Sequence, residues 1–347
     1  MRLTAVVHFI RGMFSFQKLK QPPWRTLVLL LGILGIFAVA YLVWSPGLEV
    51  RDGRHDLGTN GLWLQHGWLG DDAWFAENDR DKTVFRDEEK LRALRGKLAE
   101  HGIRYVFPHL CPCKDNGMIA PADGAQVERL LDSLTGVEVL PWIGGVKDES
   151  ALTSSEKWRT GFVASAVKLL AEHPRLAGLH VNIEPMPDGD TDYLVLLEEL
   201  KAAMPEGTLL SVAAYPPPTR WHPFPEVHWG EAYFREVARR CDQIVPMMYD
   251  SGLSWQKPYR KLMADWTKEV MAWSEGKQVL LGLPAYDDAG TGYHDPKVEN
   301  LGNALMGAHA ALEERITGNY AGVAVYSEWE MEEEDWRVLR LEFGKHR

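Results

Sequence analysis

The sequence predicts an α/β protein, a (β/α)8 TIM barrel preceded by an N-terminal transmembrane helix. Three observations support this prediction: a long apolar run near the N-terminus, a later alternation of short apolar and longer amphipathic runs, and the length of that alternation. The pattern repeats about eight times over roughly 290 residues, which matches the size and element order of a barrel. The 347 residues, 46% of them hydrophobic, suffice for one such domain.

The first element is the apolar run LVLLLGILGIFAVAYLVW, residues 27–44, which approaches the span of a bilayer. Five basic residues and no acidic residue precede it: Arg2, Arg11, Lys18, Lys20 and Arg25. The positive-inside tendency then leaves the tail in the cytoplasm and exports the rest. A cleaved signal peptide is the alternative, but the run is longer than a usual signal core and no clear A-x-A site follows it.

These features divide the chain into four parts. We predict a cytoplasmic basic tail at residues 1–25, a transmembrane anchor at 26–44, a linker at 45–60 and the barrel domain at 61–347. The barrel domain is expected to be extracytoplasmic, either periplasmic or at the cell surface.

Eight apolar runs then read as buried strands, because they are short and rich in β-branched residues. They begin near Gly61, Arg104, Val137, Ala177, Thr208, Gln243, Val279 and Tyr320. Amphipathic helices are expected between them, near residues 87–102, 154–174 and 191–205, with others starting near Asp123, Gly230, Trp255, Lys297 and Glu332. A doubly wound open sheet is the competing fold. No G-x-G-x-x-G or Walker sequence follows the first strand, so a nucleotide-binding version has little support.

Polar or aromatic residues end several of these runs: His66, His109, Glu184, Tyr215, Tyr249, Asp250, Asp287 and Glu328. In a barrel these strand ends meet on one face, where active sites lie. The fourth run, AGLHVNIEP, has His180, Asn182 and Glu184 at alternate positions, so the three side chains share a face. They form either a structural hydrogen-bond network or a catalytic acid with its neighbours. In an apolar barrel mouth, desolvation would raise the pKa of Glu184 and keep it available as a proton donor.

Four stretches together resemble glycoside hydrolase family 18, the family of chitinases and endo-β-N-acetylglucosaminidases. The family signature D-G-x-D-x-D-x-E falls on residues 177–184, M-x-Y-D on 247–250, G-x-P-x-Y on 282–286, and the last-strand pattern on 322–326. The three aspartates of the signature are replaced by Ala177, His180 and Asn182, and only Glu184 matches.

The resemblance implies a retaining, substrate-assisted glycosidase in which the acetamide of the substrate is the nucleophile. Glu184 would be the general acid/base. Asn182 would position the acetamide through its carbonyl oxygen, as the Asn-x-Glu pair of the related family 85 does, and His180 would support Asn182 from below. Tyr249 would bond the acetamide oxygen, although a packing role at the barrel rim is the alternative.

Further side chains are expected to bind substrate. They are His180, Asp250, Met247, Tyr215, Trp142, Tyr326 and Trp329. Asp250 could bond a sugar hydroxyl or only cap a loop. The Pro- and aromatic-rich segment 215–229 is expected to form a semi-rigid wall of the site.

The sequence predicts no cofactor and no metal. Cys111 and Cys113 are read as structural thiols or a local disulfide, because their spacing with His109 matches no strong metal motif; Cys241 is far away. The net charge of −11 argues against nucleic acid as a partner. The expected partners are a membrane and an oligo- or polysaccharide containing N-acetylhexosamine, and the 14 tryptophans favour a carbohydrate.

Two other functions stay open. One is a glycosidase that uses a second carboxylate, such as Asp250, Asp287 or Glu328, on a substrate without an N-acetyl group. The other is an inactive, carbohydrate-binding barrel, which the replaced aspartates favour and the retained Glu184 opposes.

Overall fold

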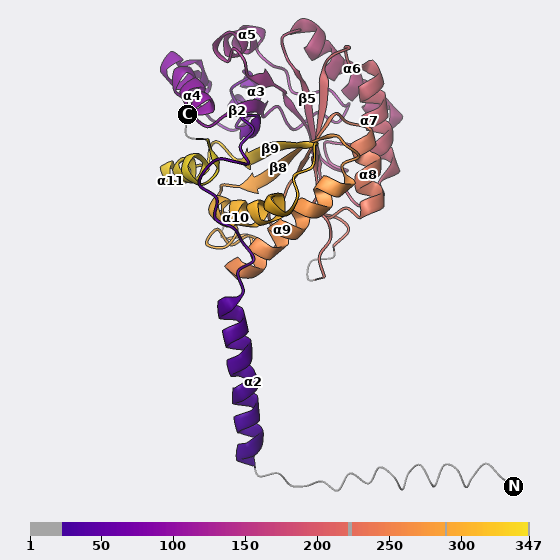
Figure 1. Ribbon diagram of the computed structural model, residues 1–347. Coiled ribbons are helices and arrows are strands. Elements are labelled where there is room, and N and C mark those ends of the chain that lie inside the picture. The colour runs from indigo at the N-terminus through magenta and orange to yellow at the C-terminus, as the bar shows by residue number, and fades with distance from the viewer. Residues whose placement is uncertain (1–22, 221–223, 289, 346–347) are drawn as a thin grey trace, which may run out of the picture. The chain divides into compact units, whose positions relative to one another are not determined.

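The computed structural model describes residues 23–220, 224–288 and 290–345 (Figure 1). The chain divides into two compact units, Met1–Ser45 and Pro46–Arg347. Most of the predicted basic tail, residues 1–22, lies outside the described residues.

The first unit contains α2 (Pro23–Val43), a helix of 21 residues. Its apolar side chains are exposed, for example Leu34 at 62% and Phe37 at 67%. A transmembrane anchor was predicted at residues 26–44. Among the residues described here, no helix combines the length and the apolar character that crossing a bilayer requires, so the structure does not support that part of the prediction.

The second unit is built on a single parallel sheet. Its described strands are β1 (Asn60–Leu64), β2 (Ile103–Pro108), β3 (Glu138–Val139), β4 (Trp142–Val146), β5 (Gly178–Glu184), β6 (Leu209–Ala214), β7 (Gln243–Pro246), β8 (Gln278–Pro284) and β9 (Tyr320–Tyr326). Their order is β3-β2-β1-β9-β8-β7-β6-β5-β4, and every pairing is parallel.

The strands at the two ends of this order, β3 and β4, follow each other in the chain and together occupy one strand position. Only Leu140 and Pro141 separate β3, which pairs with β2, from β4, which pairs with β5. The end of β2 also reaches β4, because His109 bridges Trp142 and the Leu110 amide donates to the Trp142 carbonyl at 2.9 Å. The sheet therefore curls into a closed ring with eight strand positions, and the open-sheet alternative is excluded.

Helices cover the outside of the ring (Figure 1). In the described part of this unit they are α3 (Asp72–Glu77), α4 (Glu88–Glu100), α5 (Gly124–Ser133), α6 (Glu156–Glu172), α7 (Thr191–Ala203), α8 (Glu231–Arg239), α9 (Gln256–Trp273), α10 (Leu301–Glu314) and α11 (Glu333–Val338). Two short turns of other helix types are η1 (Lys82–Arg86) and η2 (Leu339–Phe343).

Local sequence explains where these helices begin. The side chains of Asp87, Ser155 and Asp190 accept hydrogen bonds from backbone amides in the first turns of α4, α6 and α7. Each cap satisfies an amide that has no partner within its helix. The predicted helices are observed at these places, whereas α3 and η1 were not predicted.

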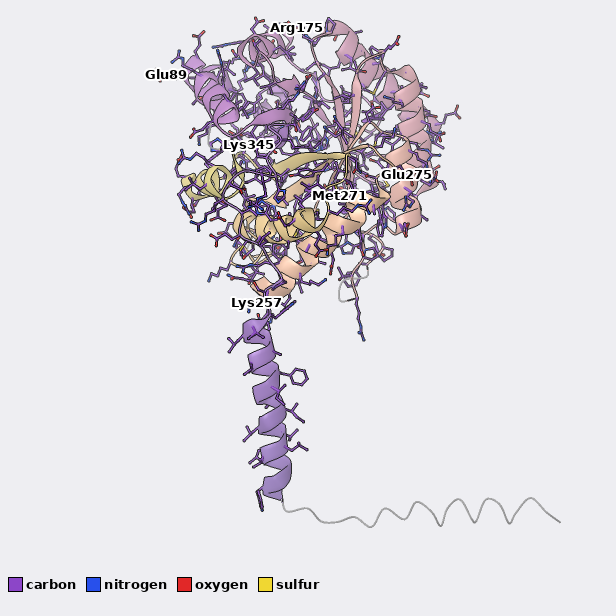
Figure 2. The ribbon with its side chains drawn as sticks, in the orientation of Figure 1. Glu89, Arg175, Lys257, Met271, Glu275 and Lys345 are labelled. Carbon is purple, nitrogen blue, oxygen red and sulfur yellow. The ribbon has the colours of Figure 1, made fainter. Side chains whose placement is uncertain are left out.

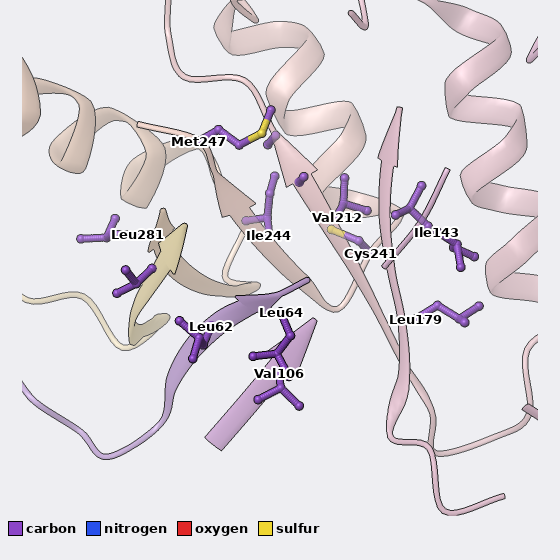
Figure 3. Close-up of a cluster of buried hydrophobic side chains, with 14 of the residues drawn as sticks. Leu62, Leu64, Val106, Ile143, Leu179, Val212, Cys241, Ile244, Met247 and Leu281 are labelled. Carbon is purple, nitrogen blue, oxygen red and sulfur yellow. The ribbon is translucent and has the colours of Figure 1, made fainter. Parts of the chain in front are cut away.

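Alternate residues of each strand enter two different layers. The outer layer lies between sheet and helices, and the strands contribute mainly aliphatic side chains to it, with Leu62, Val106, Leu179, Val212 and Ile244 among them (Figure 3). The inner layer, facing the barrel axis, is largely aromatic, with Trp63, Tyr105, Phe107 and Trp142. The polar side chains of β5 belong to this inner layer.

The remaining surface is charged. Arg175 and Glu275 lie on the outer surface (Figure 2). Arg175 pairs with Asp132 at 2.7 Å, and Glu275 pairs with Arg235 at 2.5 Å.

The segment predicted as a linker, residues 45–60, packs on the barrel along part of its length. Val50 and His55 are buried there, and the Tyr320 hydroxyl donates to the His55 carbonyl at 3.0 Å.

Candidate active site

Two hollows meet at Glu184, the last residue of β5. The tyrosine pocket, about 370 Å³, is lined by Glu184, Tyr215, Pro216, Phe224, Val227, His228, Met247, Tyr249, Asp250 and Tyr293. The imidazole pocket, about 330 Å³, is lined by His66, Trp74, His109, Cys111, Pro112, Trp142, Gly145, Val146, Asn182 and Glu184. Both lie at the carboxyl ends of the strands, where the sites of parallel barrels are found.

The Glu184 carboxyl is held by two donors. Asn182 Nδ2 donates to Oε1 at 2.6 Å, and the Tyr215 hydroxyl donates to Oε2 at 3.1 Å. Burial raises the pKa of Glu184 above its usual value, the two donors oppose that rise, and the nearby charge of Asp250 adds to it. A carboxyl in this setting is suited to giving and taking a proton near neutral pH.

Asn182 has one polar atom left for a ligand. Its Nδ2 is committed to Glu184, and no donor in the described part of the chain bonds to Oδ1. Gly144 of β4 lies directly beside Asn182, at φ +139°. A Cβ atom at Gly144 would stand 1.9 Å from the backbone carbonyl oxygen of Asn182. Only glycine allows β4 to approach β5 this closely.

His180 lies deeper in the barrel and does not line either pocket. The indole N–H of Trp63 donates to His180 Nε2 at 3.1 Å, so Nδ1 carries the proton and donates to Ser211 Oγ at 2.9 Å. Ser211 in turn donates to Gln243 Oε1 at 2.7 Å. Burial lowers the pKa of His180 to about 3.

The proposed contacts of His180 therefore need correction. It was expected to bind substrate and to support Asn182 from below, but its side chain is fully buried. Both ring nitrogens are used inside the barrel, and the described hydrogen bonds include none between His180 and Asn182.

An aromatic group packs around Tyr249, which lines the tyrosine pocket. Tyr249, after β7, stacks on Tyr326 at 5.6 Å between ring centroids, and Trp329 packs edge-on against Tyr326 at 5.3 Å. Burial raises the pKa of Tyr249 well above its usual value, so its hydroxyl stays protonated. Met247 and Tyr249 line the pocket itself; Tyr326 and Trp329 are not among its lining residues.

Asp250 enters the same pocket from the turn after β7. Its φ of +58° places it in the left-handed region, which aspartate tolerates better than most residues. The Tyr286 hydroxyl donates to its Oδ1 at 2.5 Å, and His294 Nδ1 lies 3.2 Å from the same oxygen.

The imidazole pocket is built differently. His66 Nδ1 forms a short contact with buried Asp71, and the His66 ring stacks on Trp74 at 3.8 Å between centroids. His109 Nδ1 accepts from the Cys111 amide at 3.2 Å, and burial lowers the pKa of His109 well below its usual value. Neutral His109 therefore carries its proton on Nε2.

The cysteines are free thiols, which leaves the predicted structural role and rules out the local disulfide. Cys111 Sγ faces the Trp142 carbonyl at 3.4 Å and Cys113 Sγ faces the Ser150 carbonyl at 3.1 Å. Among the described residues, no group of three or more His, Cys, Asp or Glu side chains is arranged to hold a metal.

The fold brings together most of the side chains that were expected at the site. Glu184, Asn182, Tyr215, Met247, Tyr249, Asp250 and Trp142 line the two pockets. Phe224, Val227 and His228 confirm that the segment 215–229 forms a wall, apart from residues 221–223, which lie outside the description. The contacts of Gly144 with β5 and of His294 with Asp250 were not predicted.

Comparison with known proteins gives a family and a fold. The sequence profile described as glycosyl hydrolases family 18 matches residues 78–337. The search of curated proteins gives no match.

Solved structures match at low identity and therefore support the fold alone. The spore cortex-lytic enzyme SleL of Bacillus megaterium QM B1551 aligns at 14% identity and a TM-score of 0.57, over 82% of this chain and 74% of that one. The chitinase of Chromobacterium violaceum ATCC 12472 aligns at 13% and 0.56, over 82% and 98%. The chitinase ChiB from the chitin utilization locus of Flavobacterium johnsoniae aligns at 14% and 0.51, over 83% and 98%.

Proposed function

The chain belongs to glycosyl hydrolases family 18 and is a glycoside hydrolase, and from this premise we propose that it cleaves beside an N-acetylhexosamine with retention of configuration. Glu184 is the general acid/base in this proposal, and the acetamide of the substrate is the nucleophile. The observation that carries it is the position of the Glu184 carboxyl, where the two pockets meet, with a raised pKa and Asn182 beside it.

The reaction would proceed in two steps. Protonated Glu184 donates its proton to the glycosidic oxygen while the acetamide oxygen attacks the anomeric carbon, which releases the leaving sugar and forms a cyclic oxazolinium ion. Glu184, now a carboxylate, takes a proton from the incoming water, which opens the ring on the face that the leaving group had occupied. Donation from Asn182 and Tyr215 would stabilise the carboxylate between the two steps.

Asn182 would hold the acetamide in place. Its Oδ1 can accept a hydrogen bond from the acetamide N–H, because Nδ2 is already directed at Glu184. Asn182 is neutral where the family signature has an aspartate, so it orients the nucleophile without adding a negative charge beside the cation. The Tyr249 hydroxyl, with its raised pKa, would donate to the acetamide oxygen, and Tyr326 and Trp329 would hold the Tyr249 ring from behind.

The substrate class follows from the same premise. Chitin-like oligosaccharides and the glycan strands of peptidoglycan both carry N-acetylhexosamines, and the similar structures include chitinases and a spore cortex-lytic enzyme. The aromatic Phe224 and Tyr293 at the edge of the tyrosine pocket suit the faces of further sugar rings.

The test uses Glu184→Gln on N-acetylglucosamine oligomers. We expect kcat to fall about 10³-fold, within the range for loss of a general acid, with an unchanged unfolding temperature and retained binding. Glu89→Gln on the outside of α4 (Figure 2) is the matched control and should behave as the wild type.

Three outcomes would contradict the assignment. They are full activity of Glu184→Gln, inversion of the anomeric configuration by NMR, and equal turnover of a substrate without an N-acetyl group. The last would point to a second carboxylate. Binding without turnover by the wild type would indicate a lectin.

We also propose that residues 1–45 attach the enzyme to a membrane and that the barrel is extracytoplasmic. The supporting observations are the exposed apolar side chains of α2 from Leu27 to Val43 and the basic residues that precede them in the sequence. In cells, the full chain should sediment with membranes and its barrel should be cut by protease added from outside. A chain that stays in the soluble fraction would refute the proposal.

A further inference from the structure

Behind Asp250 lies a buried group that the proposed reaction does not use. His294 and Glu299 are 4% and 0% exposed and come from the segment between β8 and α10. That segment meets the turn after β7, where the Tyr293 carbonyl accepts from the Gly252 amide at 2.8 Å. Asp250, His294 and Glu299 are called here the carboxylate–imidazole cluster.

The surroundings of His294 favour a charged ring. Nε2 faces the Tyr286 carbonyl at 3.3 Å, and a carbonyl can only accept, so Nε2 carries a proton. Nδ1 faces two carboxylates, at 3.2 Å from Asp250 Oδ1 and 4.0 Å from Glu299 Oε2. Nδ1 makes no hydrogen bond with either oxygen, but a second proton would place a positive charge beside both carboxyl groups, within ion-pair distance of each.

Glu299 fixes the backbone next to Asp250. Its Oε2 accepts from the Ser251 amide at 3.0 Å, and its Oε1 accepts from the Ser251 hydroxyl at 3.0 Å. The residue before Ser251 is Asp250, at φ +58°. Both carboxylate oxygens of Glu299 therefore hold the turn in the conformation that directs Asp250 into the tyrosine pocket.

The two oxygens of Asp250 have different surroundings. Oδ1 receives the Tyr286 hydroxyl at 2.5 Å and the His294 contact at 3.2 Å. The Tyr286 and His294 rings stack at 4.2 Å between centroids, so each ring restrains the other beside Asp250. Oδ2 has no hydrogen-bond partner within the described chain, and it belongs to a residue that lines the pocket.

We propose that His294, charged and held beside Glu299, is a positioning residue that holds the Asp250 carboxyl group in place and aims its Oδ2 at a hydroxyl of the bound sugar. The proposal rests on the proposed function, because it assigns a sugar to the tyrosine pocket. It concerns the strength of substrate binding, and Glu184 remains the proton donor.

The groups around His294 set the direction of its pH dependence. Asp250 faces it from the turn after β7, Glu299 from the start of α10, and the Tyr286 hydroxyl from the end of β8, while Tyr259 of α9 lies near both carboxylates. Burial alone would lower the pKa of His294, but the two carboxylates raise it above its usual value. Removing the charge of Glu299 must therefore lower the pKa of His294.

The first experiment separates binding from chemistry. His294→Gln should raise KM for N-acetylglucosamine oligomers about tenfold, with kcat changed less than about threefold, because it removes the charge that holds Asp250. His173→Gln removes a similar His–Glu contact on the outside of the barrel, 2.7 Å from Glu128, and should leave both constants unchanged. A fall in kcat at unchanged KM would overturn the proposal.

A double-mutant cycle tests whether His294 acts through Asp250. In the Asp250→Asn background, His294→Gln should change KM less than about twofold, since the group it positions is already altered. Full additivity of the two effects would show that His294 has a separate, structural role.

A readout without turnover keeps this inference distinct from the proposed function. Imidazole ¹⁵N NMR of the full chain should show His294 doubly protonated at pH 7, and Glu299→Gln should move its titration to lower pH. A neutral His294 at pH 7 would overturn the inference even if the enzyme is active. A charged His294 in a protein that hydrolyses no N-acetylated glycan would overturn the proposed function alone.

Discussion

The seven residues of β5 divide between an outer and an inner face that serve different purposes. Leu179, Val181 and Ile183 face the helices and are at most 2% exposed, within the hydrophobic outer layer. His180, Asn182 and Glu184 face the axis and hold hydrogen bonds within the barrel or at its mouth. The buried side chains of the outer face contribute to stability. On the inner face, the deep residue His180 belongs to a structural hydrogen-bond network, and Glu184 at the barrel mouth is the reactive carboxyl group.

Truncation of residues on opposite faces of β5 is expected to have the largest effects. Leu179→Ala should lower the free energy of unfolding by about 2–5 kcal/mol, because it leaves a cavity in a closely packed layer, with kcat unchanged below the unfolding transition. Asn182→Ala, three residues away, should lower kcat about 10²–10³-fold, as the loss of one positioned polar group does, with little change in unfolding.

Urea denaturation and turnover of N-acetylglucosamine oligomers measure both quantities on the same preparations. If Leu179→Ala lost specific activity while folded, or Asn182→Ala were as unstable as Leu179→Ala, the two faces would not be separable.

Ser211 distinguishes the buried part of the inner face from the part at the barrel mouth. Ser211→Ala should cost about 1–3 kcal/mol of stability, because it leaves the His180 N–H and the Gln243 carbonyl unpaired inside the barrel. It should leave kcat within about threefold, since this chain of hydrogen bonds does not reach Glu184. Thermal unfolding and kcat are the measurements. A fall in kcat as large as that of Asn182→Ala would mean that the deeper polar residues take part in the chemistry.

The smallest expected effect is a pH shift. The Tyr215 hydroxyl favours the ionised form of Glu184, so Tyr215→Phe should raise the pKa of Glu184 further. Because the general acid acts protonated, the high-pH limb of kcat/KM should move to higher pH. Tyr233→Phe is the matched control, since the Tyr233 hydroxyl donates to the Asp190 carbonyl away from both pockets. A limb that stays in place, or moves to lower pH, would contradict Glu184 as the acid.

The sequence predicted which face of a strand each residue occupies, but not how deep in the barrel the residue lies. Alternation along residues 177–184 correctly placed His180, Asn182 and Glu184 on one side, and the run lengths predicted the alternating strands and helices. A period of two cannot say how far along the axis a residue lies, so His180 was expected beside the substrate. Its partners Trp63 and Ser211, and Gln243 to which Ser211 donates, come from three other strands, and only the folded ring brings them together.

The carboxylate–imidazole cluster illustrates the same limit. His294 and Glu299 stand in an irregular segment without periodicity, 44 and 49 residues after Asp250 in the numbering. The fold brings these residues together through the contact of two loops, which pairwise spacing in one sequence does not reveal. Membrane attachment and the export of the barrel remain predictions.

Pairing of β1 with β9 has a consequence for how the protein is made. Gly61 and Leu62 of β1 lie opposite Ala324 and Val325 of β9. One edge of β1 therefore stays unpaired until nearly the whole chain has been synthesised. During synthesis, each earlier strand can form local pairs, but the ring stays open until the last strand leaves the ribosome. The nascent chain therefore exposes an unpaired strand edge throughout its elongation, an interval in which chaperones or an export machinery can engage it.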